Sequence, residues 1–353
     1  MSSCYGNKLK VQVFGQSHSS AIGVVIDGFP SGMKVDTEFL ARFMARRAPG
    51  QALSTPRVEK DAVEFLSGLN ENGETCGAPI CAIIKNENTR SKDYSNLAIT
   101  PRPSHSDYTS LIKYGESRDI RGGGQFSGRL TAPLCIAGAL CLQYLSEKGV
   151  KIGAHISSIL DVIDDAYNPI NDEIEANVCG FSCINAEKAE QMKSVIEQAR
   201  AELDSVGGTI ECKITGLSAG LGDPMFDGVE NRLAQMMFAI PAVKGFEVGA
   251  GFECSKMKGS ENNDALCVVD GKVKTVTNNA GGINGGITNA MPVLFKVGFK
   301  PTPSIAKPQQ SVNLVEMKEE ILEIKGRHDP CIVVRAVPVV EACSAIVVLD
   351  MML

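Results

Sequence analysis

Alternating and periodic apolar positions predict the elements of the first third of the chain. Residues 9–13 alternate between apolar and polar, and 22–26 form an apolar run, which predicts two short strands joined by a polar turn carrying His18. Residues 35–47 have the apolar spacing of an amphipathic helix. The apolar run at 79–84 predicts a buried strand.

The same pattern continues beyond residue 130. Residues 134–148 are apolar around most of a helical circumference, which predicts a central helix, whereas 185–205 predict a charged outer helix. His155 occupies an alternating position in a predicted strand, and we expect it to be structural. Residues 292–299 and the apolar run at 331–340 predict two further buried strands.

A glycine-rich stretch lies between the two halves of this pattern. Residues 105–133 contain His105, three consecutive glycines at 122–124 and then Arg129 ahead of the central helix. Adjacent glycines suit a backbone that approaches another group closely, and the first turn of a helix binds anions readily. A phosphate-bearing ligand is one hypothesis, and a tight turn before a buried helix explains the same residues.

Two later segments also carry candidate chemistry. Residues 278–305 combine two glycine pairs with a rigid KPTPS turn, a plausible clamp on a flat, anionic ligand. Arg327, His328 and Asp329 form an ionisable cluster at the entrance of the last predicted strand. Neither a Rossmann nor a P-loop signature is present.

Composition narrows the class of protein. The 353 residues favour two domains or one large duplicated core, and 44% hydrophobic with 22% charged residues is typical of a soluble globular protein. A net charge of -6 argues against nucleic acid and anionic membranes as partners. Twelve cysteines after a polar N-terminus predict reduced thiols in the cytoplasm. Cys179 and Cys183 have no second pair at zinc spacing, so we expect no metal.

Ten motifs follow one another along most of the chain. The first four are FGQSHSSAIGVVIDGFPSG, RRAPGQ, RPSHSDYTSLIKYG and DIRGGGQFSGRLTAP. The others are DSVGG, GLGDPMFD, IPAVKGFEVGAGF, NNAGGINGGITNAMPV, FKPTPSI and GRHDPCIVVRAVPV. In this order they resemble the motifs of the chorismate synthase family.

The resemblance implies a fold and an activity. The expected fold is α+β, one domain over residues 1–353 with a duplicated, intertwined core and helices sandwiched between two antiparallel sheets. The expected reaction is the 1,4-anti elimination of phosphate from 5-enolpyruvylshikimate 3-phosphate to give chorismate. It requires reduced FMN without net redox change, in a homotetramer. Bifunctional relatives reduce the flavin with NADPH, but no dinucleotide signature argues for that here, so we expect an external flavin reductase.

The resemblance also implies roles for individual residues. His18 would act as general acid toward the departing phosphate, and His105 would protonate or stabilise the reduced flavin. Asp329 would lie near the flavin N5 and relay the proton taken from the substrate carbon. The candidate substrate-binding residues are Arg47, Arg57, Arg102, Arg129 and Arg327. The candidate flavin-binding residues are Gln125, Phe126, Ser127, Ala242, Gly285, Lys300, Pro301, Thr302, Pro303, Ser304 and Arg327.

Several positions depart from the family motifs. Gln16 replaces a Glu, Gln125 an Arg, Phe126 a Ser and Leu130 a Glu, and one residue is missing after Arg47. Loss of an Arg and a Glu together fits a compensated change, whereas loss of the Arg alone would weaken flavin or substrate binding. The first alternative is therefore a flavin-binding relative with another anionic substrate or flavin reductase activity. A non-catalytic assembly protein is the second.

Overall fold

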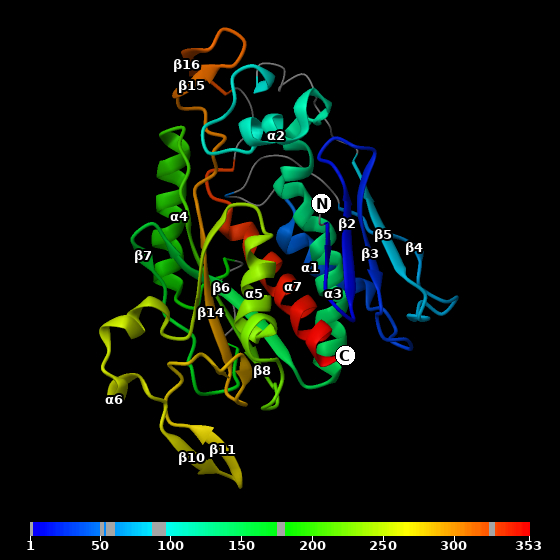
Figure 1. Ribbon diagram of the computed structural model, residues 1–353, viewed down its shortest axis with the longest axis vertical. Helices are drawn as coiled ribbons and strands as arrows, with labels where there is room; N and C mark the ends of the chain where they lie inside the picture. The colour runs from blue at the N-terminus through cyan, green and yellow to red at the C-terminus, as the bar shows by residue number, and fades with distance from the viewer. Residues whose placement is uncertain (1–2, 50–52, 54–60, 87–96, 175–180, 325–328) are drawn as a thin grey trace.

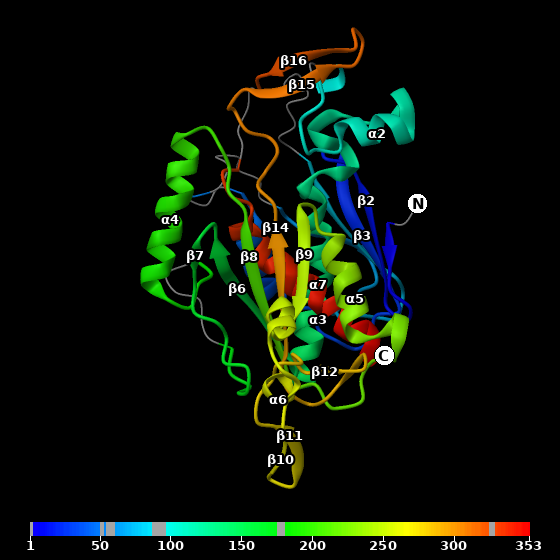
Figure 2. The same ribbon diagram turned by 60° about the vertical axis from the view of Figure 1, so that its left-hand side comes forward.

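Two five-stranded antiparallel sheets enclose a central layer of helices (Figure 1). The computed structural model describes residues 3–49, 53, 61–86, 97–174, 181–324 and 329–353. The first sheet has the order β1 (Cys4–Tyr5), β2 (Lys10–Gly15), β3 (Ala21–Asp27), β5 (Ile80–Lys85) and β4 (Glu64–Ser67). The second has the order β7 (Val162–Ile163), β6 (Lys151–Ile159), β8 (Gly208–Thr215), β14 (Val293–Phe299) and β9 (Val243–Val248), visible side by side in Figure 2.

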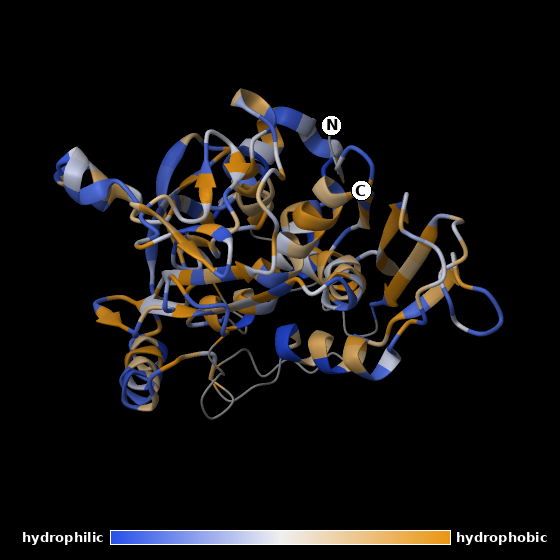
Figure 3. Cartoon of the chain, turned by 90° about the horizontal axis from the view of Figure 1, so that it is seen from below, coloured by the Kyte–Doolittle hydropathy of each residue, from blue (hydrophilic) through white to orange (hydrophobic). Residues whose placement is uncertain are grey.

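Strand alternation directs one side of each sheet inward. Val24 on β3 pairs with Val13 and Ala82, and Phe295 on β14 pairs with Cys212 and Val248. Side chains at successive positions of a strand point to opposite faces of the sheet. The paired apolar residues therefore share one face, and that face packs on the helices. Long stretches of the strands and the enclosed helices are hydrophobic in Figure 3.

The helices between the sheets form the central layers. They are α1 (Thr37–Arg47), α3 (Thr131–Glu147), α5 (Val229–Phe238) and α7 (Val333–Met352). Helix α3 packs on the first sheet, α7 packs on β6 and β8 of the second, and the two helices pack on each other. A Cβ built on Gly138 of α3 would lie 2.2 Å from Cβ of Ala342 on α7, so only glycine permits this approach.

The remaining elements lie around this sandwich. Helix α2 (Asp107–Tyr114) lies at the upper end in Figure 1, α4 (Ala186–Ala201) covers the outer side of the second sheet, and α6 (Gly259–Asn262) is a single turn. Three hairpins are β10 (Leu266–Val269) with β11 (Lys272–Thr275), β12 (Ile283–Asn284) with β13 (Ile287–Thr288), and β15 (Gln309–Asn313) with β16 (Lys318–Leu322). Short 3₁₀ segments cover Gly115–Ser117, Arg121–Phe126, Gly128–Leu130, Met225–Asp227 and Gly251–Lys256.

Most sequence predictions of elements are confirmed, and one is wrong. The two N-terminal strands, the helix at 35–47, the central helix and the outer helix correspond to β2, β3, α1, α3 and α4. In the run at 331–340, predicted as a strand, residues 333–340 form the first part of helix α7. Its β-branched residues favour a strand. A helix enclosed between two sheets is buried on all sides, however, and it accepts the same apolar residues.

Two features of the core have simple interpretations. Gly128–Glu147 is long and apolar enough to span a membrane, but it lies in the buried middle of the molecule.

His155 is 1% exposed and contacts Asp164 at 3.0 Å and Glu211 at 2.9 Å. These contacts join β6, β8 and the chain after β7, in agreement with a structural role.

Candidate functional site

A cavity of about 630 Å³ opens where the C-terminal end of α1 meets the starts of α3 and α7. The glycine turn, the loop before β9 and the loop after β14 complete its walls. This volume is within the range typical of small-molecule sites, about 300–1,000 Å³. Its wall includes the cationic side chains of Arg47, Arg102, Arg129, Lys244, Lys300 and Arg335. The cavity therefore suits an anionic ligand, although the chain as a whole is acidic.

The three glycines form a turn that no other residue could adopt without strain. Gly122, Gly123 and Gly124 have φ of 61°, 84° and 55°, in the left-handed region. A Cβ on Gly122 would lie 2.6 Å from Ser17 Oγ and 2.8 Å from His18 Nε2. The glycine turn, defined as residues 122–124, thus packs directly against His18, which is 7% exposed.

Two arginines of the wall share one buried carboxylate. Arg47 Nη1 lies 2.9 Å from Asp61 Oδ2, and Arg129 pairs with the other oxygen of Asp61. Arg47 also donates to Thr131 Oγ1 and to the carbonyl of Gly128, both at 3.2 Å. Burial and the neighbouring Arg335 and Arg129 lower the pKa of Arg47 to about 10, against the opposing effect of Asp61. The carboxylate holds both guanidinium groups at the cavity.

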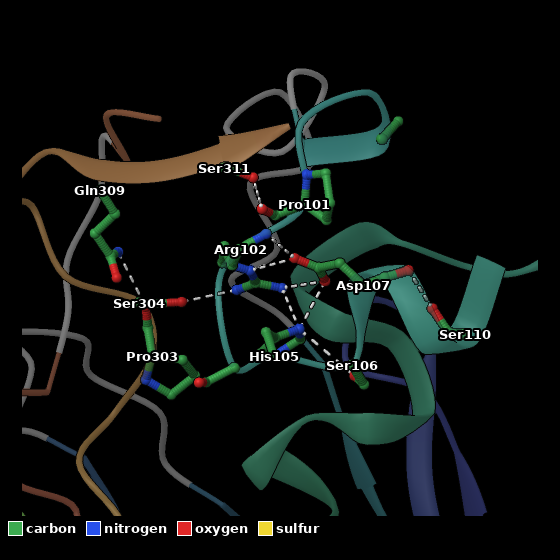
Figure 4. A network of polar contacts seen from close by, with 12 residues as sticks. Pro101, Arg102, His105, Ser106, Asp107, Ser110, Pro303, Ser304, Gln309 and Ser311 are labelled. Carbon is green, nitrogen blue, oxygen red and sulfur yellow. Dashed lines mark hydrogen bonds and ion pairs between the residues drawn. The ribbon is translucent and has the colours of Figure 1, made fainter. Parts of the chain in front are cut away.

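A second network surrounds His105 (Figure 4). Arg102 donates from Nε to Asp107 Oδ2 at 2.7 Å and from Nη2 to Oδ1 at 2.8 Å, a bidentate pair. Its Nη1 donates to Ser304 Oγ at 2.8 Å, and Asp107 Oδ1 lies 2.6 Å from His105 Nδ1. Burial acts to raise the pKa of Asp107, but hydrogen bonds from Arg102 and His105 outweigh it and hold the pKa well below its usual range.

Asp329 lies in a third ion pair at the start of α7. Arg335 Nη1 contacts Asp329 Oδ2 at 2.7 Å, while Arg335 Nε donates to the carbonyl of Arg47 at 3.0 Å. Arg335 therefore connects the end of α1 with the entrance of α7. Asp329, Arg335 and Arg47 all line the cavity.

The loop after β14 forms the opposite wall. Lys300 N donates to the carbonyl of Ala242 at 3.0 Å, and its Nζ donates to the carbonyl of Ser104 at 2.5 Å. Burial and the nearby Lys244 lower the pKa of Lys300. Among the described residues, the buried Thr302 Oγ1 has no hydrogen-bond partner.

An apolar surface completes the wall. It consists of Phe126, Phe238, Ile240, Val243, Phe299, Ile332 and Val339. The ring of Phe126 lies 6.2 Å from that of Tyr114 between centroids. One cavity therefore offers both a flat apolar contact and several cations.

The structure brings most of the candidate residues to this cavity. The lining includes His105, Asp329, Arg47, Arg102, Arg129, Gln125, Phe126, Ser127, Ala242, Lys300, Thr302, Pro303 and Ser304. His18 lies behind Gly122, and Pro301 Cδ lies beside Gly207, 3.1 Å from a Cβ built there. Gly285 lies in the turn between β12 and β13 and is not among the residues that line the cavity. Arg57 and Arg327 lie outside the described residues.

Sequence reasoning missed four charged residues of the site. They are Asp61, Asp107, Lys244 and Arg335. Asp107, Lys244 and Arg335 belong to motifs quoted above, so the neighbouring candidate residues were a signal for them. Arg335 also lay within the run predicted as a strand, and Asp61 had no local signal.

Fold and site together define an α+β enzyme with a cation-lined internal cavity. The family model for chorismate synthase matches residues 9–353, and the chain belongs to the chorismate synthase family, a family of lyases.

Individual relatives agree with this assignment. The chain is 47% identical to the chorismate synthase of Christiangramia forsetii, covering 98% of this chain and 96% of the relative. It is 44% identical to that of Bacteroides thetaiotaomicron, covering 99% and 97%. A crystal structure of a chorismate synthase superposes with a TM-score of 0.75 at 27% identity, covering 99% of this chain and 92% of that one. The predicted fold class is thereby confirmed.

Proposed function

We propose that this chain converts 5-enolpyruvylshikimate 3-phosphate to chorismate by 1,4-anti elimination of phosphate, with reduced FMN and no net redox change. The observation that carries this proposal is the gathering of six cationic side chains around one cavity of an acidic chain. A substrate with two carboxylates and a phosphate needs several fixed cations, and arginine binds such oxyanions in a bidentate manner.

The residues of the cavity fit a flavin. The apolar surface and the ring of Phe126 offer a contact for a flat ring system. Lys300 and Lys244 offer positive charge for a phosphate tail, and the buried Thr302 Oγ1, without a partner among the described residues, suits a ligand acceptor. When bound, reduced flavin supplies transient electron density that no side chain of the protein provides.

The side chains of this chain handle protons and charge. Arg47 and Arg129, held by Asp61, bind the anionic groups of the substrate. His18 holds a proton for the departing phosphate, whose charge develops on oxygen as the bond breaks, and His105 exchanges a proton with the ligand at Nε2. Asp329 accepts the proton released from the substrate carbon. The apolar surface excludes water and strengthens these interactions.

An anaerobic assay with reduced FMN and the enolpyruvyl substrate tests the proposal. We expect release of inorganic phosphate, with a fall of about 10²–10⁴-fold in kcat for His18→Ala and for His105→Ala. Bound flavin without phosphate release would favour the alternative, a flavin-binding relative that acts on another anionic substrate or reduces flavin. Unchanged function in both histidine variants would favour an assembly protein.

The proposal extends to the state of the protein in the cell. We propose a cytoplasmic homotetramer that receives reduced flavin from a separate reductase. The family resemblance supports the tetramer, and the lack of a dinucleotide signature in the sequence supports the separate reductase. Light scattering measures the assembly, and NADPH consumption by the purified protein with FMN would contradict the need for a reductase.

A further inference from the structure

All hydrogen-bonding contacts of the His105 ring with the described residues fall on one ring nitrogen (Figure 4). Asp107 Oδ1 lies 2.6 Å from Nδ1, Arg102 Nη2 lies 3.0 Å away, and Ser106 Oγ lies 3.5 Å away. The other nitrogen, Nε2, lies at the glycine turn, 3.6 Å from a Cβ built on Gly123. The ring is thus held at Nδ1 and presents Nε2 to the site.

The partners of Nδ1 determine where the proton of the neutral ring resides. A guanidinium group has only donors, and an ionised carboxylate has only acceptors. Asp107 is ionised, since hydrogen bonds from Arg102 and His105 hold its pKa low despite burial. The shortest contact of Nδ1 is to this carboxylate, so Nδ1 carries the proton and Nε2 carries the lone pair.

The guanidinium of Arg102 serves mainly to hold this arrangement. Nε and Nη2 donate to the two oxygens of Asp107, and Nη1 donates to Ser304 on the opposite wall. The backbone N of Arg102 also donates to Asp107 Oδ2 at 3.1 Å. Three donors fix one carboxylate, and its orientation is therefore tightly determined.

We propose that Asp107 is a positioning residue that keeps His105 in the Nδ1–H tautomer and directs its reactive nitrogen, Nε2, toward the ligand. Arg102, expected from the sequence to bind substrate, acts instead through Asp107 and Ser304. The kinetic part of this inference rests on the proposed function, because it is measured as phosphate release. The tautomer is a property of the protein itself.

Asp107 affects both protonation states of the His105 ring. In the neutral state, the ring offers a lone pair at Nε2 and can take a proton there. The resulting imidazolium donates from Nε2 while Nδ1–H remains bonded to a carboxylate of opposite charge. With an amide in place of the carboxylate, the NH₂ group can face Nδ1 and favour the opposite tautomer, which leaves a proton on Nε2 in the neutral ring.

The test combines nitrogen-15 NMR of the histidine rings with kinetics of phosphate release. The chain has four histidines, and the spectrum of His105→Gln assigns the signals of the missing ring. Spectra from about pH 5 to about pH 9 cover the range in which imidazole titrates. The wild-type protein should show His105 with Nδ1 protonated and Nε2 unprotonated in the neutral form.

The variant Asp107→Asn should lose this signature. Its kcat should fall by about 10²–10⁴-fold, the usual contribution of a positioned acid or base, while KM for the enolpyruvyl substrate changes less. The matched control is Glu116→Gln, which removes a carboxylate just beyond α2 that is 93% exposed and 3.8 Å from Arg118. The control should retain the tautomer and kcat.

The possible outcomes are distinguishable. A wild-type His105 with the proton on Nε2 would overturn the proposal, as would an Asp107→Asn variant with unchanged kcat. If that variant does not fold, the wild-type spectrum alone decides. Absence of phosphate release by the wild-type protein would sink the proposed function, and the tautomer would then still support or overturn the positioning role.

Discussion

Each arginine that lines the described cavity is held by a carboxylate. Asp61 holds Arg47 and Arg129, Asp107 holds Arg102, and Asp329 holds Arg335. Buried ion pairs contribute little net stability because desolvation offsets the attraction, but removal of one partner leaves a costly buried charge. These acids therefore determine where the cations lie rather than how stable the fold is.

The glycine turn provides a prediction at the scale of a single residue. Gly122→Ala should lower both stability and kcat, because the added Cβ meets His18 Nε2 at 2.8 Å and the backbone has φ of 61°. Gly271, in the turn between β10 and β11, also has a positive φ of 73°, but a Cβ there meets nothing within 4 Å. Gly271→Ala is thus a control that carries the strain of a left-handed backbone, about 1–2 kcal/mol, without the contact.

The measurement is denaturant unfolding together with phosphate-release kinetics. Gly122→Ala should be the less stable of the two variants and should alone lose activity. Equal effects in both variants would mean that the contact with His18 is irrelevant.

The sequence predicted this site best through residue types that are rarely explained by structure alone, such as adjacent glycines. Three adjacent glycines and a histidine marked residues 105–133 as a ligand-binding stretch, and residues at its two ends, 105–106 and within 122–131, line the cavity. The partners of those residues were not predictable in the same way. Asp61 reaches Arg129 across 68 positions of sequence, a pairing that only the packed fold determines.

At the scale of elements, α7 shows where pattern reasoning fails. An apolar run with a single polar position, Arg335, has no period that distinguishes a strand from a helix. The strand alternation of β2 and the amphipathic spacing of α1 both arise because one face meets water. Helix α7 has almost no such face, so its identity depends on the surrounding sheets.

At the crossing of α3 and α7, a Gly-to-Ala substitution should change stability in the direction opposite to that expected from helix propensity. Replacing a helical Gly by Ala usually stabilises a helix by about 1 kcal/mol. Gly138→Ala should instead destabilise the protein by about 1–3 kcal/mol, because the new Cβ overlaps Ala342. Adding Ala342→Gly should recover part of this loss, measured as a coupling energy by denaturant unfolding. A simple sum of the two single effects would show that the helices do not meet there.

The contacts of His155 predict a dependence of stability on pH. Burial acts to lower the pKa of His155, but the bonds to Asp164 and Glu211 outweigh it, so the folded pKa lies above the ordinary 6.5. The folded state then binds more protons than the unfolded state between these two values. The stabilisation is full below about pH 6.5 and is lost as pH rises through the folded pKa.

The comparison is with His155→Gln. Wild-type stability, measured by urea unfolding, should fall relative to the variant as pH rises above about 6.5. Parallel curves over that range would show that His155 stays neutral. Asp164 and Glu211 have lowered pKa values despite burial, because of hydrogen bonds from His155 and backbone N–H groups, and their contributions are lost only at acidic pH.

At the scale of the whole molecule, Asp350 near the end of α7 joins distant parts of the chain. Its carboxylate accepts the backbone N–H groups of Asn7, Lys8 and Leu9, at 2.7–3.1 Å, and pairs with Arg232 of α5. The segment between β1 and β2 of the first sheet is therefore fixed to a helix that packs on the second sheet.

Asp350→Asn should destabilise the protein by about 1.5–3 kcal/mol, since hydrogen bonds to a charged acceptor are lost and Arg232 loses its counter-charge. Hydrogen exchange of the backbone amides of residues 7–9 should quicken together with the change in urea midpoint. Asp27→Asn, an exposed carboxylate at the end of β3, is the control and should shift stability by no more than about 0.5 kcal/mol. Protection unchanged at residues 7–9 would contradict the proposed link.

The position of α7 also has a consequence for how the molecule is made. Both sheets leave the ribosome before α7, so the inward faces of β6 and β8 lack their main helical partner during synthesis. Exposed apolar strands of this kind are prone to aggregate or to be retained by chaperones. Folding of this chain should therefore be completed late, when α7 enters between two layers already formed.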